Sequence, residues 1–157
     1  MKKLLLLFIA ALTFSLTTKA QDESGGGSPS SSYKDALGVR LGSNVPVIKN
    51  GITYKHFMGN NAIEGILSFG DGVGICGLYE IHKPLSTTNL QWLIGAGAYV
   101  GFNSNTSNVG AAGIVGLDYK FNQVPLNITL DWKPELNIIS KVGFEGSGIG
   151  FSARFTF

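Results

Sequence analysis

The sequence is poor in charged residues, which make up 14% of its 157 positions against about 25% in an ordinary soluble domain. It contains a single cysteine, Cys76, so no disulfide can form within the chain. Proline is scarce at five residues, whereas glycine reaches 22. No apolar run approaches the roughly 20 residues that a membrane-spanning helix needs. A disulfide-stapled domain and a chain of membrane-spanning helices are therefore excluded, in a chain whose length suits one domain.

The first twenty residues have the features of an export signal. Lys2 and Lys3 precede an apolar stretch at positions 4–16, whose 13 residues are too few to span a membrane. Thr18 and Ala20 place small residues where a signal peptidase cleaves. The sequence predicts a signal peptide over residues 1–20, with an N-terminal membrane anchor as the alternative. Because no cysteine follows the apolar stretch, a lipoprotein anchor is excluded.

Removal of this segment changes the charge of the chain. The formal net charge of +2 includes Lys2, Lys3 and Lys19, so the rest of the chain has nine basic and ten acidic residues. A net charge of −1 gives no basis for a nucleic-acid partner. Residues 21–32, QDESGGGSPSSS, are predicted to form a Gly/Ser-rich flexible linker. Residues 33–157 then form the one folded domain.

From residue 33 onward, apolar and polar residues alternate with a period of two, and no segment has the 3.6-residue period of an amphipathic helix. Runs rich in Gly, Asn, Pro and Ser separate the alternating segments. The pattern predicts an all-β chain with an even number of strands. These strands are expected at 33–44, 51–58, 62–70, 72–82, 90–102, 111–121, 126–138 and 148–157.

Each predicted strand has one apolar face and one face of charged and small residues. A soluble barrel or sandwich would bury the apolar face, whereas a membrane barrel would turn it toward lipid. The polar face favours the membrane barrel, because its charges are balanced and lie among Gly, Ser and Thr, as a narrow interior requires. The expected lumen charge network comprises Arg40, Lys55, Glu64, Glu80, Asp118, Lys120, Asp131, Lys133, Glu135 and Arg154.

Strand length and aromatic placement support the same architecture. Strands of about ten residues tilted near 40° rise about 25 Å, the height of the apolar band of an outer-membrane barrel. An open edge is not tolerated in lipid, so the last strand must pair with the first. The sequence therefore predicts an eight-stranded antiparallel up-and-down transmembrane β-barrel. With a periplasmic N-terminus, an aromatic girdle is expected at one rim from Tyr33, Tyr79, Trp92, Tyr119, Phe121, Phe155 and Phe157.

Several segments resemble known proteins. The export signal, the alternating strands and the C-terminal FSARFTF resemble bacterial outer-membrane β-barrels, in which a last strand ending in an aromatic residue directs the insertion machinery. The segments GITYKHFMGNNAIEGILSF, LQWLIGAGAYVGF and GLDYKFNQVPLNITLDWKPELNII are similar to small outer-membrane proteins of Bacteroidota, with eight-stranded barrels of the OmpA, OmpX and OmpW type. DYKF followed by PLNITLDWKP is the most specific part of a resemblance that covers most of residues 33–157.

This resemblance implies a fold and a location, the cell outer membrane, and no established activity. The partners it implies are outer-membrane lipids and the insertion machinery, which would act on the C-terminal strand.

No motif indicates catalysis or a bound cofactor. GVGICG, residues 72–77, matches the dinucleotide pattern G-x-G-x-x-G but lies in a strand pattern rather than before a helix. His56 and His82 are expected near the periplasmic rim, away from the chemistry of surface lipids. Two histidines and one cysteine are too few for a typical metal site. We therefore expect neither an enzyme nor a cofactor or metal, with Cys76 an inert thiol in the lumen.

Three functions remain open at this level. The first is an integral outer-membrane barrel with a structural or surface-interaction role and a lumen filled by side chains. Its outer loops near residues 45–50, 103–109 and 139–147 would meet any surface ligand. The second is a narrow channel for ions or small solutes, and the third is a lipid-modifying outer-membrane enzyme.

Overall fold

A computed structural model describes residues 33–43, 47–70, 72–85, 89–104, 106–139 and 142–157. The predicted signal peptide (1–20) and linker (21–32) lie outside the described residues. Within the described ranges, no helix is long and apolar enough to cross a membrane. The strands are β1 (Asp35–Ser43), β2 (Asn50–Met58), β3 (Asn61–Phe69), β4 (Val73–Pro84), β5 (Leu90–Phe102), β6 (Ser107–Lys120), β7 (Leu126–Trp132), β8 (Glu135–Asn137), β9 (Gly143–Glu145) and β10 (Ile149–Thr156).

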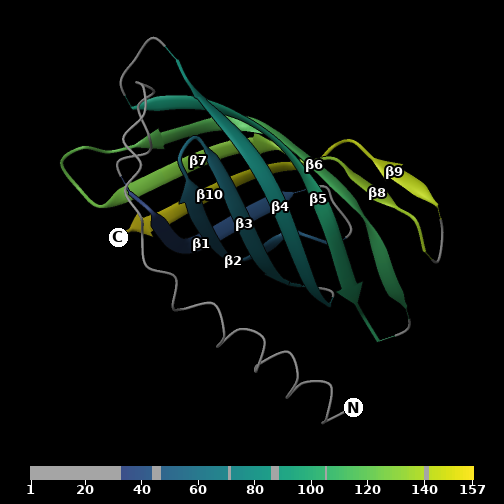
Figure 1. Ribbon diagram of the computed structural model, residues 1–157. Coiled ribbons are helices and arrows are strands. Elements are labelled where there is room, and N and C mark those ends of the chain that lie inside the picture. The colour runs from purple at the N-terminus through teal and green to yellow at the C-terminus, as the bar shows by residue number, and fades with distance from the viewer. Residues whose placement is uncertain (1–32, 44–46, 71, 86–88, 105, 140–141) are drawn as a thin grey trace.

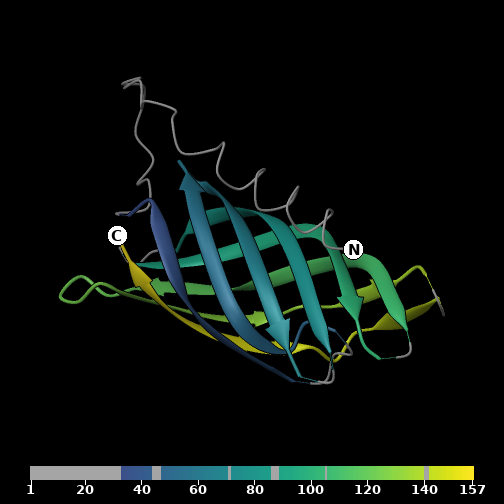
Figure 2. The ribbon, with the colours of Figure 1, turned by 90° about the horizontal axis from the view of Figure 1, so that it is seen from below.

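The chain forms a closed eight-stranded antiparallel barrel, as predicted. From β1 to β7 each strand pairs with the next, β10 pairs with β7, and β1 closes the wall by pairing with β10. β8 continues the line of β7 by pairing with β6, and β9 pairs with β8, so the wall itself has eight strands. In the closing pair, Leu37 lies opposite Phe155 and Leu41 lies opposite Phe151. Figure 1 shows the wall curving around a single axis, and Figure 2 shows β10 (yellow) beside β1 (purple).

The stagger of the strands is fixed by their register. A line drawn through paired residues from Tyr119 on β6 passes once around the barrel and returns to β6 at Val109, ten residues away. A stagger of ten over eight strands corresponds to a strand tilt of about 40°. The tilt and the strand lengths together give a wall about 25 Å high. The line passes through Ile128, Ala153, Val39, Ile52, Leu67, Ile75 and Val100.

Alternation along each strand separates an outer from an inner face. In β4, for example, Val73 and Ile75 are exposed on the outside, whereas Cys76 and Glu80 are buried inside. The exposed face is apolar and the buried face carries the charges, which is the reverse of a soluble barrel. The distribution of side chains therefore follows the membrane-barrel pattern.

The two ends of the barrel differ. We call the end with Tyr33 and Phe157 the terminus end, and the end with residues 47–49, 103–104 and 106 and the β8–β9 hairpin the loop end. Two residues, Gly59 and Asn60, join β2 to β3 at the terminus end. Gly59 has a φ of 66°, a left-handed conformation that glycine adopts without strain.

The predicted seventh strand, 126–138, is broken in the structure. Pro134 has no amide hydrogen to donate to the sheet, so pairing with β6 is interrupted between β7 and β8. The carbonyl of Pro134 still accepts a hydrogen bond from the amide of Gly113 at 3.0 Å. Part of the predicted outer loop 139–147 is also a strand, because β9 folds back on β8. The first residues of β6 likewise occupy 107–109 of the predicted loop 103–109.

The two ends of the folded domain are joined at the closing seam. The amide of Asp35 donates to the carbonyl of Phe157 at 3.0 Å, and the amide of Phe157 donates to the carbonyl of Asp35 at 2.9 Å. The terminal residue is thus held by backbone pairing rather than frayed.

Close backbone approach at the seam yields a testable prediction. A Cβ placed on Gly38 would lie 1.9 Å from the carbonyl oxygen of Ala153 on β10, whereas a Cβ on Gly65 meets no atom within 4 Å. We expect Gly38→Ala to lower the free energy of unfolding by about 1–3 kcal/mol, because the seam must shift to admit the methyl group. Urea unfolding in detergent micelles, followed by tryptophan fluorescence, measures this change. Gly65→Ala is the matched control, and an equal loss in both variants would contradict the close approach.

Candidate functional site in the barrel interior

A layer of charged side chains crosses the middle of the barrel. Lys55 on β2 places its Nζ atom 2.8 Å from Glu80 Oε2 on β4 and 3.5 Å from Asp118 Oδ2 on β6. Glu64 on β3 lies 3.7 Å from the same ammonium group. All four side chains are buried. Because an isolated buried charge is very unfavourable, each of these carboxylates depends on a shared cation.

Arg154 on β10 spans the same layer from the opposite wall. Its guanidinium pairs with Glu64 and donates to Thr129 Oγ1 at 2.6 Å and to Thr53 Oγ1 at 3.1 Å. Asn127 accepts a further hydrogen bond at 3.2 Å. Six strands thus contribute to one layer of ion pairs and hydrogen bonds, which joins walls that are not neighbours in the sheet.

Two further ion pairs lie outside this layer. Arg40 on β1 binds Asp131 on β7 through both terminal nitrogens, at 2.7 and 2.6 Å. A Cβ on Gly150 would lie 2.1 Å from this guanidinium, so the glycine leaves room for the arginine. Lys133 binds Glu135 at 2.6 Å. Both pairs are buried and charge-neutral.

The predicted lumen charge network requires one correction. The structure places all of its members in the interior except Lys120, whose half-buried side chain donates at the terminus end to the carbonyls of Phe121, at 2.5 Å, and Val124, at 3.1 Å. Lys120 stands where β6 leaves the wall for the turn, so its ammonium reaches free turn carbonyls. The prediction for Lys120 is therefore wrong.

His82 is a member of the interior polar network that the sequence did not predict. Without Lys120, the five buried carboxylates face four lysine and arginine side chains. His82 is buried on the inner face of β4, with its Nε2 atom 2.8 Å from Glu80 Oε2. His82 thus joins the charged layer through Glu80. Its phase with Glu80 along β4 was the sequence signal for this role, and counting only lysine and arginine missed it.

Apolar side chains fill the part of the interior bounded by β3 to β6. Tyr99 on β5 and Leu78 on β4 pack there with the buried thiol of Cys76. These strands also carry Glu64, Glu80 and Asp118, and most of the apolar cluster lies on the loop-end side of those carboxylates. The apolar cluster comprises Ile48, Ile66, Cys76, Leu78, Leu93, Tyr99, Ala112 and Ile114.

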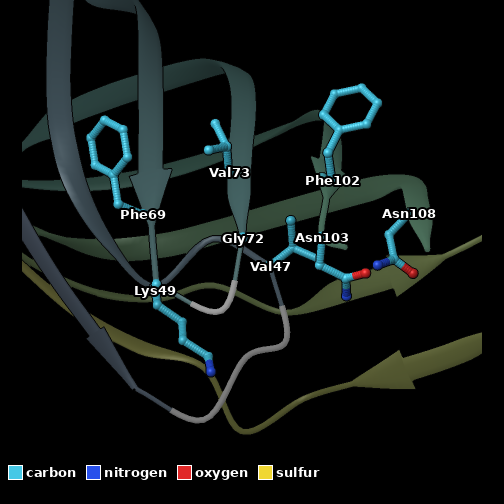
Figure 3. Close-up of a pocket in the computed structure, with 10 residues that line it drawn as sticks. Val47, Lys49, Phe69, Gly72, Val73, Phe102, Asn103 and Asn108 are labelled. Atoms are coloured by element: carbon cyan, nitrogen blue, oxygen red, sulfur yellow. The ribbon is translucent and has the colours of Figure 1, made fainter. Parts of the chain in front are cut away.

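Residues 47–49 fold into the barrel mouth at the loop end. Ile48 is fully buried, and its amide donates to Glu135 Oε1 at 3.2 Å. Ser68 fastens the segment from β3: its hydroxyl accepts from the amide of Lys49 at 2.9 Å and donates to the carbonyl of Val47 at 3.1 Å. Figure 3 shows Val47 and Lys49 among the strand ends of a shallow pocket.

This inward segment corrects, for residues 47–49, the prediction of an outer loop near 45–50 for a surface ligand; residues 45 and 46 lie outside the described residues. The side chain of Val47 occupies the space over Gly101, where a Cβ would meet Val47 Cγ1 at 2.3 Å. The two glycines of β4 and β5 that face the mouth, Gly74 and Gly101, admit the segment. At positions 47–49 the chain is thus a plug for the barrel rather than an exposed surface.

The terminus end is closed by a second cluster, which corrects the prediction for Tyr33. Tyr33 is 9% exposed and packs inside the barrel against Phe57, with ring centroids 5.0 Å apart. Phe57 in turn contacts the ring of His82 at 4.8 Å. Tyr33 precedes β1, so strand alternation does not fix its direction, and it caps the interior instead of joining an outer girdle.

The other predicted girdle residues are half-buried or exposed on the barrel. Tyr119 and Phe121 meet edge to face with centroids 4.8 Å apart, and Phe155 stacks on Phe157 at 6.4 Å. Lys83 Nζ lies 5.7 Å from the ring centre of Trp92. The residues concerned are Tyr79, Trp92, Tyr119, Phe121, Phe155 and Phe157.

The histidines do not form a catalytic pair. His56 lies on the outer face of β2 and contacts Asp35 at 2.8 Å, whereas His82 points inward. Among the residues that the structure describes, no three His, Cys, Asp or Glu side chains are arranged to hold a metal ion. Five of the six residues of GVGICG, from Val73 on, lie in β4.

Comparison with known proteins gives a fold likeness. No protein-family model and no curated protein matches the sequence. Among solved structures, the chain is similar to the crystal structure of the N-terminal β-barrel domain of Pseudomonas aeruginosa OprF, with a TM-score of 0.59 and 14% sequence identity. The match covers 80% of this chain and 98% of that domain. This likeness supports the barrel fold and no particular activity.

The charged layer yields a second prediction. Lys55→Met leaves Glu80 and Asp118 without the cation they share, so we expect a loss of about 3–5 kcal/mol in the free energy of unfolding. Adding Glu80→Gln to this variant should restore part of the loss, because one uncompensated carboxylate is removed. Urea unfolding gives the free energy of unfolding of the wild type, of Lys55→Met and of Lys55→Met with Glu80→Gln. Lys34→Met, which removes an exposed ammonium, is the control, and a loss equal to that of Lys55→Met would refute the role of the layer.

Proposed function

We propose that this chain is an integral outer-membrane β-barrel protein with a structural or surface-interaction role and a lumen filled by side chains. The observation that carries the proposal is the reversal of its two faces. Leu, Ile, Val and Phe point outward all around the wall, while nine lysine, arginine, aspartate and glutamate side chains are buried inside. A continuous apolar surface of this kind is unsuited to water and suited to lipid.

Several features support the outer membrane in particular. A closed barrel satisfies every backbone group of the wall within the sheet, which hydrocarbon requires. The wall height of about 25 Å matches the apolar band of such barrels. The export signal predicted at residues 1–20 and the likeness of the sequence to small outer-membrane proteins of Bacteroidota point the same way. In this proposal the terminus end is periplasmic, with an aromatic girdle at its rim.

The C-terminal strand supports a role in assembly. Phe155 in β10 and Phe157 just after it are exposed, and β10 closes the barrel against β1. We propose that the outer-membrane insertion machinery acts on this strand. Outer-membrane lipids are the other proposed partner, in contact with the apolar wall.

The filled lumen supports a structural role over a channel. Ile48 blocks the loop end, Tyr33 and Phe57 close the terminus end, and the layer around Lys55 lies between them. An eight-stranded barrel has an interior just wide enough for such a filling.

A gel shift tests the proposed membrane barrel. Closed outer-membrane barrels keep their fold in SDS until they are heated, because the wall has no edge at which unfolding can begin. We expect the purified protein, refolded into lipid vesicles, to migrate differently with and without boiling. Identical mobility in both samples would overturn the proposal.

Conductance separates the filled barrel from the channel. In planar bilayers we expect no unit conductance from the wild-type protein or from Lys133→Ala and Glu135→Ala, because other layers still fill the lumen. Steps in the wild type whose ion selectivity changes in these two variants would establish the channel instead. Unboiled gel samples confirm that each variant is folded.

A further inference from the structure

The β8–β9 hairpin carries an apolar face that the barrel does not cover. Val142 and Phe144 are 76% and 68% exposed, more than any other large hydrophobic side chain described. Leu136 lies opposite Phe144 across the hairpin, and Ile138 is also exposed. Figure 1 shows the hairpin reaching past the wall beside β6.

The opposite face of the hairpin is fixed to the barrel. Glu135 turns inward to Lys133 and to the amide of Ile48. Asn137 donates from Nδ2 to Asn108 Oδ1 at 3.0 Å, and the amide of Ile138 donates to the carbonyl of Val109 at 2.9 Å. These bonds hold the polar face of the hairpin toward the barrel, so the apolar face points away from it.

The hairpin also has one open edge. Among the strands that the structure describes, β9 pairs only with β8, so the other side of Gly143–Glu145 has no strand beside it. Unpaired backbone groups are not tolerated in hydrocarbon, and a large apolar face is unfavourable in water. The boundary between acyl chains and headgroups meets both needs, because it offers apolar contact on one side and hydrogen-bonding groups on the other.

The apolar face is continuous with the apolar wall of the barrel. Below the hairpin, Trp132 on β7 lies opposite Ile149 on β10, and both are exposed. Trp132 Nε1 also donates to the carbonyl of Gly146 at 2.6 Å, which ties the hairpin to the wall. Leu136 follows Trp132 along the outer face of β7 and β8. The same surroundings therefore cover both the apolar wall and the base of the hairpin.

We propose that the β8–β9 hairpin is a lipid-binding element, whose outer face lies on the acyl chains of the outer leaflet while its open edge lies among the headgroups. This inference rests on the proposed membrane barrel and adds a site to it. The hairpin anchors one side of the loop end at the membrane surface, rather than standing in water as a loop for soluble ligands.

Spin labelling tests the depth of the hairpin. In a Cys76→Ala background, which removes the native thiol, a nitroxide is attached at Phe144→Cys and, as a matched control on the other face of the same strand, at Glu145→Cys. In lipid vesicles the label at 144 should collide more often with oxygen, which concentrates in acyl chains, than with a water-soluble nickel complex. The ratio of oxygen to nickel collisions should be severalfold higher at 144 than at 145.

Two further labels distinguish a failure of the hairpin proposal from a failure of the membrane-barrel proposal. Phe151→Cys reports on the wall, and Asn103→Cys reports on the loop between β5 and β6. A label at 144 as open to nickel as the one at 103 would overturn the hairpin proposal while a lipid-exposed label at 151 upholds the membrane barrel. Water exposure at 151 would overturn the barrel proposal itself. Dipolar broadening between labels at 144 would show that a second copy, not lipid, covers the hairpin.

Discussion

Pairing of β1 with β10 is the constraint on which the rest of the structure depends. It removes the edges of the sheet and fixes eight strands with a stagger of ten, which sets the width of the interior. Every inward side chain must then find its place in a space of fixed size. Arg40 reaches Asp131 only because Gly150 leaves its position open, and Val47 enters the mouth only over Gly101.

The interior ion pairs join strands that the sheet does not. Arg154 on β10 meets Glu64 on β3, and Lys55 on β2 meets Asp118 on β6. Buried ion pairs contribute little net stability over apolar packing, because desolvation offsets their attraction. Here the ion pairs fix the register of the strands. A slip of one residue in any strand would turn its charges onto the apolar outer face, so the pairs select one alignment among many.

Alternation in the sequence was enough to predict the strands, their closure and most of the inward charges, because a period of two leaves only two faces to choose between. It failed where alternation stops. Tyr33 precedes β1, Lys120 stands at the end of β6, and residues 47–49 belong to no strand. Their directions depend on what the finished barrel offers them: an apolar cap, turn carbonyls and an open mouth.

The β8–β9 hairpin was hidden for a different reason. Its strands have three residues each, too few for a period to be read, and Pro134 interrupts the pairing between β7 and β8. His82 was missed because only lysine and arginine were taken as partners for the inward carboxylates, although its position in β4 is in phase with Glu80.

The paired hydrogen bonds between Asp35 and Phe157 have a consequence for biogenesis. β1 pairs with β2 on one side, and its other edge stays open until β10 pairs with it. A sheet without β10 has two open edges. Such edges are not tolerated in hydrocarbon, and in water they promote aggregation. The seam can therefore form only when β10 is present to pair with both β1 and β7.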